Sequence, residues 1–169
     1  MKTLYTILIM LCLLPAFDCA AQKAGKAKSY TDNPAIPSFE ILLKDGTVFN
    51  TDSIPAGQPV VMIFFSTDCS KCRMFVRELQ SNYAPLRDTR IYMATPMSMD
   101  GALIFAHDVG LDFFKNITWG VDHKNFVKPY YDIATLPAAV VYDSNKQFVQ
   151  RFNGNFTAAE VIKAVESVK

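Results

Sequence analysis

Val60–Cys72 reads V-V-M-I-F-F-S-T-D-C-S-K-C, an unbroken apolar run that ends at two cysteines separated by two residues. The six residues from Val60 to Phe65 are rich in β-branched and aromatic types and are too few for a lone buried helix, so they predict a strand covered on both faces. Residues 66–68 then offer hydroxyls and a carboxylate, the groups that cap helices. The stretch therefore predicts a strand that delivers two thiols to the start of a helix.

The predicted helix carries both thiols on one face. Its inward positions have helical spacing and are Cys72, Phe75, Val76 and Leu79. Cys69 falls at or near the helix N-terminus, where unpaired amides and the helix dipole favour a thiolate over a thiol. Cys72 follows three residues later, within disulfide reach, and we expect it to be the more buried cysteine. The pair thus suits an attacking thiol and a resolving thiol.

Two charged residues adjoin Cys69. Lys71 would favour the Cys69 thiolate by its positive charge, although it could equally be a solvated surface lysine. Asp68 would oppose the thiolate unless its carboxylate caps the helix, which is the orientation we expect. Both residues are therefore candidates for tuning the pKa of Cys69.

The first 21 residues have the features of a secretory signal peptide. Lys2 supplies the charged region and Leu4–Leu14 the apolar region, which is short for a membrane span. Small residues at 20–21 follow Cys19 and suit cleavage before Gln22, while lipid attachment at Cys19 is an alternative. Residues 22–37 lack apolar periodicity and are predicted to be a flexible leader. We therefore expect an exported, periplasmic protein with one folded domain over 38–169.

The composition of the chain excludes several classes of function. The 169 residues are half apolar and carry a formal net charge of +1, so one ordinary core is expected and nucleic-acid binding is not. Removal of the signal would leave only Cys69 and Cys72 as thiols, which excludes a framework of several disulfides. No phosphate-binding glycine motif is present, and no cofactor is predicted.

Strand and helix patterns alternate along the rest of the chain. Strands are predicted over 38–43, 47–49, 90–95, 117–121, 136–142 and 147–152, and helices over 100–114, 125–133 and 158–168. A D-G turn at residues 44–46 predicts a hairpin between the first two strands. Gly110 is expected to weaken the first of these helices and Pro129 to break the second. The alternation predicts an α/β fold whose sheet is covered on both faces.

Three segments together resemble the thioredoxin superfamily. They are the strand that enters Cys69-Ser-Lys-Cys72, the run Tyr131–Pro137 that enters the strand 138–142, and the final hairpin with Gly154 before the last helix. The leading hairpin and an inserted helix–strand unit are more similar to the TlpA-like extracytoplasmic thiol–disulfide oxidoreductases than to minimal thioredoxin. The resemblance covers about 39–169 and implies a thioredoxin fold, a central mixed sheet flanked by helices.

The resemblance also implies roles for Leu136 and Pro137. Pro137 would be cis and pack beside the dithiol, leaving the backbone of Leu136 free to pair with an extended substrate strand. A trans proline at the first residue of a strand is the alternative. The chain departs from the family at Ile63 and Phe75, where relatives carry proton-relay carboxylates, so a cytochrome-specific function is not transferred and water would supply the proton.

The dithiol and the resemblance predict a thiol–disulfide oxidoreductase that acts on protein disulfides or dithiols through a mixed disulfide. Reduction, fed by a membrane electron donor, is the expected direction, and the protein is expected to be a monomer. The alternatives are an oxidase or isomerase, a binding module with a structural disulfide, and a thiol peroxidase. A copper carrier would use the methionines at 93, 97 and 99, and a zinc site would need His107 and His123. No metal is expected.

Overall fold

A mixed sheet of seven strands forms the centre of the computed structural model, which describes residues 29–169. Its order is β2-β1-β5-β4-β3-β6-β7. The strands are β1 (Glu40–Leu43), β2 (Val48–Asn50), β3 (Val60–Phe64), β4 (Arg90–Thr95), β5 (Ile117–Val121), β6 (Ala138–Tyr142) and β7 (Phe148–Asn153). The predicted signal peptide, its cleavage site and the lipid alternative at Cys19 lie outside the described residues.

The central strand β3 lies between β4, which is parallel to it, and β6, which is antiparallel. All five of its residues are buried, as the apolar run predicts. Val61 and Ile63 point into one core cluster, and Val60, Met62 and Phe64 into another. Because successive side chains of a strand point to opposite faces, β3 contributes to the core on both faces of the sheet.

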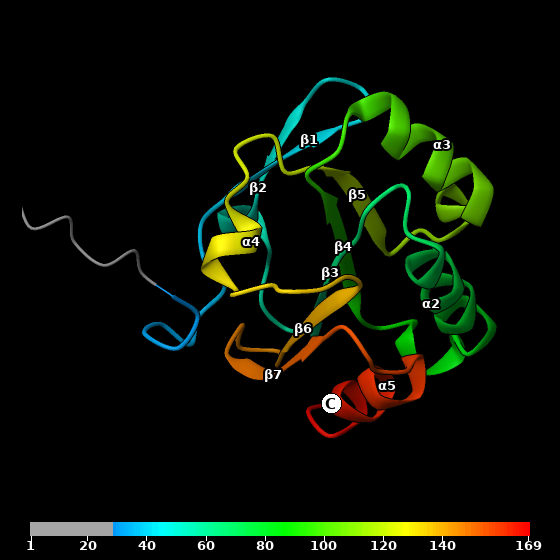
Figure 1. Cartoon of the computed structure of the whole chain (residues 1–169). Coiled ribbons are helices and arrows are strands. Elements are labelled where there is room, and N and C mark those ends of the chain that lie inside the picture. The colour runs from blue at the N-terminus through cyan, green and yellow to red at the C-terminus, as the bar shows by residue number, and fades with distance from the viewer. Residues whose placement is uncertain (1–28) are drawn as a thin grey trace, which may run out of the picture.

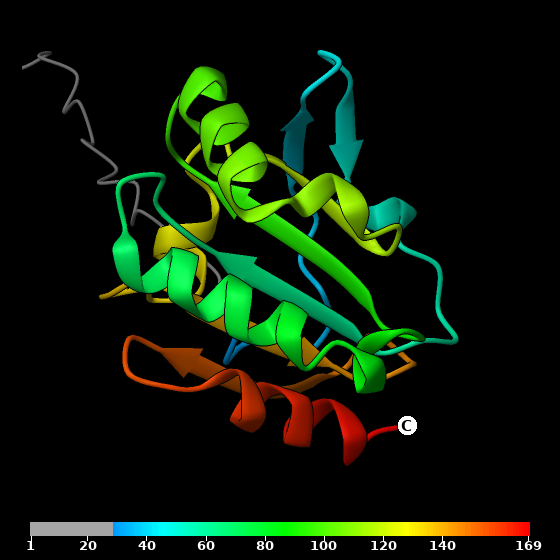
Figure 2. The same cartoon turned by 90° about the vertical axis from the view of Figure 1, so that its right-hand side faces the viewer.

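Three long helices cover one face of this sheet (Figures 1 and 2). They are α2 (Ser70–Ser81), α3 (Met99–Val109) and α5 (Ala158–Glu166). The short helix α4 (Val127–Tyr130) lies on the opposite face. Residues 29–169 also contain three 3-10 turns, which are η1 (Thr51–Ser53), η2 (Ala84–Leu86) and η3 (Leu111–Phe113). The predicted mixed sheet flanked by helices is confirmed, as is the leading β1–β2 hairpin. The inserted unit is α3 with β5, which joins the hairpin to the rest of the sheet.

Two predicted helices differ from the observed ones. The helix expected over 100–114 ends at Val109, because Gly110 adopts the left-handed conformation (φ 67°) that closes a helix. The helix expected over 125–133 spans only Val127–Tyr130, and Pro129 lies inside it instead of breaking it. Proline is tolerated there because the first-turn amides of a helix have no partner within it.

Residues 29–37, the described part of the predicted flexible leader (22–37), pack against the domain. Ala35 forms a β-bridge with Gln147, and the Phe148 amide donates to the Pro34 carbonyl at 2.6 Å. The Tyr30 ring lies 5.5 Å from that of Phe148. The composition of this stretch is that of a linker, but its few apolar side chains find partners on the α4 side of the sheet.

A pair of tyrosine hydroxyls is buried beneath α4. The hydroxyls of Tyr131 and Tyr142 lie 2.8 Å apart, and the Tyr131 side chain is fully buried. Burial raises the pKa of Tyr131 well above its usual value and raises that of Tyr142 as well. Each phenol satisfies the other as a neutral group, so the folded protein favours the protonated form.

This pair predicts a loss of stability at alkaline pH. Above about pH 10 the unfolded tyrosines ionise while the folded ones keep their protons, so unfolding releases protons and the free energy of unfolding falls as pH rises. A single such group contributes a slope of about 1.4 kcal/mol per pH unit. We expect Tyr131→Phe to have a shallower decline than the wild type in urea unfolding between pH 9 and 11. If the free energy of unfolding fell equally steeply with pH in the variant and the wild type, Tyr131 would not be a source of the alkaline loss of stability.

Candidate active site

The two cysteines lie where β3 passes into α2. The chain leaves β3 at Phe64, and α2 begins at Ser70 with Cys69 as its N-cap. The Cys72 amide donates to Cys69 Sγ at 3.1 Å. The expected cap from Asp68 is therefore wrong, since the thiol sulfur itself occupies the capping position. A helix amide aimed at this sulfur would also stabilise its thiolate after reduction.

Cys69 and Cys72 form a disulfide, with their Cα atoms 5.2 Å apart. Cys72 is completely buried, whereas Cys69 is partly exposed, which confirms the expected difference. Cys72 packs in the core beneath α2, so solvent and partner molecules meet Cys69 first. Because of this difference in burial, Cys69 Sγ can react with an external molecule, whereas Cys72 Sγ can react only with Cys69.

The segment before β6 lies against the exposed sulfur. Cys69 Sγ is 3.9 Å from the carbonyl oxygen of Leu136, and the Leu136–Pro137 peptide bond is cis, as the resemblance implied. The antiparallel pairing of Phe64 with Ala138 holds this segment beside the end of β3. The Pro137 carbonyl accepts from the Gly154 amide at 3.0 Å, but within residues 29–169 the Leu136 amide has no hydrogen-bond partner. Leu136 thus has its carbonyl oxygen beside Cys69 and an amide without a hydrogen-bond partner in the described residues.

Lys71 and Asp68 are both exposed and flank Cys69 in the chain. Lys71 lines a shallow pocket of about 220 Å³ with Met74, Pro137 and Asn155. Its cation therefore lies on the same surface as the first residues of α2 and the cis-proline. Neither side chain is held by an ion pair within the described part of the chain.

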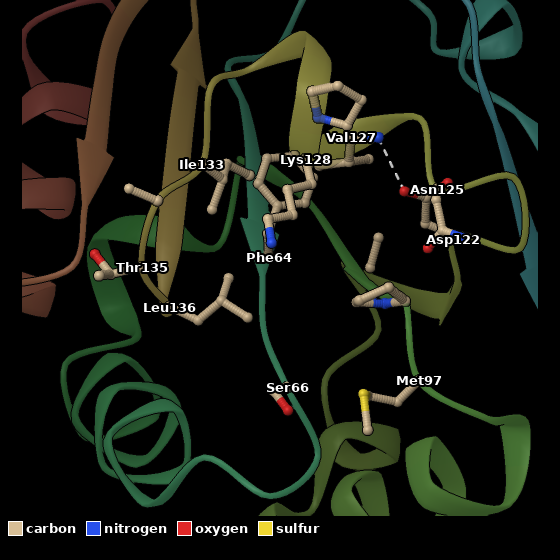
Figure 3. A pocket seen from close by; sticks show the side chains of 14 residues that line it. Phe64, Ser66, Met97, Asp122, Asn125, Val127, Lys128, Ile133, Thr135 and Leu136 are labelled. Carbon is tan, nitrogen blue, oxygen red and sulfur yellow. Dashed lines mark hydrogen bonds between the residues drawn. The ribbon is translucent and has the colours of Figure 1, made fainter.

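A larger pocket of about 560 Å³ opens on the other side of Leu136 (Figure 3). In Figure 3 the side chains of Leu136, Ile133 and Phe64 lie across from that of Met97. Ser66, which precedes the cysteines, also lines the pocket. Two residues of the pocket wall, Ser66 and Leu136, therefore also lie next to Cys69.

Asp122 shapes this pocket and was not recognised from the sequence. It is 3% exposed, and its carboxylate accepts hydrogen bonds from the amides of Phe126 (3.0 Å) and Val127 (2.9 Å). The carboxylate therefore fixes the start of α4, which forms one wall. One sequence feature could have identified Asp122 as the cap of a helix. It directly follows a predicted strand and stands four residues before the apolar pair Phe126-Val127.

The residues considered for metal binding are dispersed. Met93 is buried in the core, whereas Met97 lines the large pocket. The His107 side chain is 93% exposed, and His123 lies 3.7 Å from Glu40. Across residues 29–169, no group of three or more His, Cys, Asp or Glu side chains is placed to hold a metal ion.

Comparison with known proteins agrees with this geometry. The family model described as a thioredoxin-like domain matches residues 52–169. A search of curated proteins finds no match.

Solved structures share the fold. DsbF of Mycobacterium tuberculosis, solved in mixed oxidised and reduced forms, has a TM-score of 0.66 at 17% identity, with 78% of this chain and 95% of that chain covered. A secreted disulfide oxidoreductase of the same organism has a TM-score of 0.63 at 19% identity, with 76% and 95% covered. The exposed lipoprotein thioredoxin Etrx1 of Streptococcus pneumoniae has a TM-score of 0.58 at 19% identity, with 78% and 99% covered.

Proposed function

The chain belongs to the thioredoxin-like domain family. We propose that this thiol–disulfide oxidoreductase is exported and reduces protein disulfides. The observation that carries the proposal is the pairing of a partly exposed Cys69 with a fully buried Cys72. Such an arrangement suits a sulfur that is attacked or attacks from outside and a second sulfur that resolves the intermediate. Its substrates are protein thiols and disulfides.

The first step is attack by the reduced protein. The Cys69 thiolate attacks one sulfur of a substrate disulfide, the substrate's S–S bond breaks, and the other substrate sulfur leaves as a thiolate. The helix amide from Cys72 stabilises the Cys69 thiolate before the attack. The charge of Lys71 favours that thiolate, and the charge of Asp68 opposes it. Leu136 holds the substrate backbone through its free amide, in the manner of an added strand.

The second step releases the product. The Cys72 thiol gives its proton to water, and its thiolate attacks Cys69 Sγ. The S–S bond between Cys69 and the substrate breaks, and the substrate leaves as a thiolate that takes a proton from water. Two electrons have then moved from the protein dithiol to the substrate, and the Cys69–Cys72 disulfide seen in the structure is the product state. A membrane electron donor would regenerate the dithiol.

Export rests on the sequence of residues 1–21, with lipid attachment at Cys19 as its variant. Similar solved proteins include a secreted oxidoreductase and an exposed lipoprotein, which supports a location outside the cytoplasm. In residues 29–169 no helix has the length and apolar character needed to cross a membrane. We propose that the mature protein works as a periplasmic monomer.

Equilibrium with glutathione buffers tests the direction of electron flow. We expect the reduction potential of Cys69–Cys72 to be at or below about −250 mV, the range of reductants such as thioredoxin. The fraction of reduced protein is measured by thiol alkylation and mass spectrometry. A potential between about −180 and −120 mV would overturn the reductive direction and make the protein an oxidase or isomerase.

A further inference from the structure

A side chain of the last strand holds the segment that lies against Cys69. We propose that Asn153 is a positioning residue for thiol–disulfide exchange, because its side-chain amide fixes the backbone at Thr135 and so orients Leu136. This inference rests on the proposed function, in which Leu136 pairs with the backbone of an extended substrate, and deepens it by naming the group that orients Leu136.

The segment 132–136, between α4 and β6, has no regular secondary structure of its own. Asp132 has a φ of 49°, a left-handed conformation that a residue other than glycine keeps where its surroundings hold it. Within the described residues, the Thr135 amide has its hydrogen bond only with the Asn153 side chain. The geometry of this segment therefore depends on contacts that come from outside it.

Asn153 supplies such contacts from the end of β7, where it pairs with Ala138 of β6. Its Oδ1 accepts from the Thr135 amide at 3.2 Å and from Thr135 Oγ1 at 3.3 Å. Its Nδ2 donates to the Asp132 carbonyl at 3.4 Å. A backbone amide can only donate and a carbonyl can only accept, so an asparagine side chain satisfies both groups, whereas a hydrocarbon side chain would satisfy neither.

The start of the same segment is held by Arg151, two residues earlier in β7. Arg151 Nη1 donates to the carbonyls of Tyr131 at 2.6 Å and Asp132 at 2.7 Å. The Asp132 carbonyl is thus held from two sides. The end of the segment, next to Leu136, depends on Asn153.

The bonds of Asn153 act on the dithiol through one peptide group. Thr135 and Leu136 share a planar peptide bond, so fixing Thr135 limits the directions in which the Leu136 amide can point. The Leu136 carbonyl lies 3.9 Å from Cys69 Sγ. A substrate strand paired with Leu136 therefore has its sulfur placed by the orientation of that residue. An error of about 1 Å in such a placement can lower a rate about a hundredfold.

A peptide disulfide and a small disulfide together test this role. The first is a disulfide-linked homodimer of a short peptide with one cysteine, and the second is 2-hydroxyethyl disulfide, which has no backbone to pair with Leu136. Second-order rate constants of the reduced full chain are measured with each by acid quench and mass spectrometry. We expect Asn153→Leu to lower the peptide rate constant at least about tenfold and to leave that of the small disulfide within about twofold of the wild type.

Two further variants locate the effect. Asn153→Asp keeps the acceptor for the Thr135 amide and loses the donor, so its peptide rate constant should stay within about threefold of the wild type. Gln150→Leu removes an exposed amide side chain from the same strand, and both of its rate constants should match those of the wild type.

The outcomes separate the positioning role from the proposed function. Reduction of the peptide by Asn153→Leu at the wild-type rate would overturn the positioning role. Equal losses with both disulfides would also overturn it, because they would indicate a general distortion of the dithiol. An Asn153→Asp variant as slow as Asn153→Leu would show that the bond to Thr135 is not what orients Leu136. If the wild type reduced neither disulfide, the proposed function itself would be overturned.

Discussion

A Cys69→Ser variant should lose disulfide reduction down to the level of buffer, a fall of at least about a thousandfold. The serine hydroxyl is not a nucleophile at neutral pH without an activating base, and Cys72 is too buried to meet an external disulfide. The measurement is insulin reduction with dithiothreitol as electron source, followed by turbidity. Reduction by Cys69→Ser at the wild-type rate would show that another group attacks the substrate.

The matched control is Cys72→Ser, which keeps the attacking thiol and removes the resolving one. This variant should also fail in turnover, but it should accumulate one covalent mixed disulfide with its substrate in a single encounter. Non-reducing electrophoresis and mass spectrometry detect that adduct. If Cys69→Ser trapped the substrate and Cys72→Ser did not, the two roles would be reversed, against the burial of Cys72.

A Gly120→Ala variant should unfold more easily, with a loss of about 2–3 kcal/mol in the free energy of unfolding. Gly120 pairs with Leu43 of β1, and a methyl group there would overlap the Leu42 carbonyl oxygen and press on the Ile41 side chain. Backbone atoms cannot yield as a flexible side chain can. The β1–β2 hairpin should therefore separate from β5.

Urea unfolding of the oxidised protein measures the loss, and amide hydrogen exchange at Leu42 and Leu43 locates it. Thr118→Ala in the same strand is the control and should cost at most about 1 kcal/mol, because Thr118 is only partly buried and the change removes atoms instead of adding them. A Gly120→Ala protein with the wild-type midpoint and the wild-type exchange at Leu43 would show that the hairpin tolerates the methyl group.

The central strand and the dithiol could be predicted from the sequence because both depend on local patterns. Val60–Phe65 is apolar throughout, and the structure has β3 over Val60–Phe64 with every residue buried. The turn at Gly46 was recognisable from its Asp-Gly pair, and the structure gives Gly46 a positive φ of 83°, which glycine adopts readily. The cis bond at Pro137 was not a local signal and came only from resemblance to a family.

The cap of α2 and the large pocket could not be predicted in the same way. Three oxygen-bearing residues precede Cys69, and which residue becomes the cap depends on where the helix begins to within one position. The pocket is assembled from segments far apart in the chain, from Phe64 to Leu136. No periodicity in the sequence brings Met97 opposite Leu136, because that placement follows from the order of β4, β3 and β6 in the sheet.

The packed segment 29–37 covers part of the edge strand β7, where another molecule could otherwise pair with the sheet. Strand β7 is the last strand in the sheet and would present unpaired amides and carbonyls to other molecules. The bridge from Ala35 to Gln147 and the bond from Phe148 to Pro34 cover the start of that border. Pro34 and Pro37 lack amide protons, so the covering segment offers fewer donors to a further strand. A stretch with a linker's composition thus covers the first residues of the edge strand.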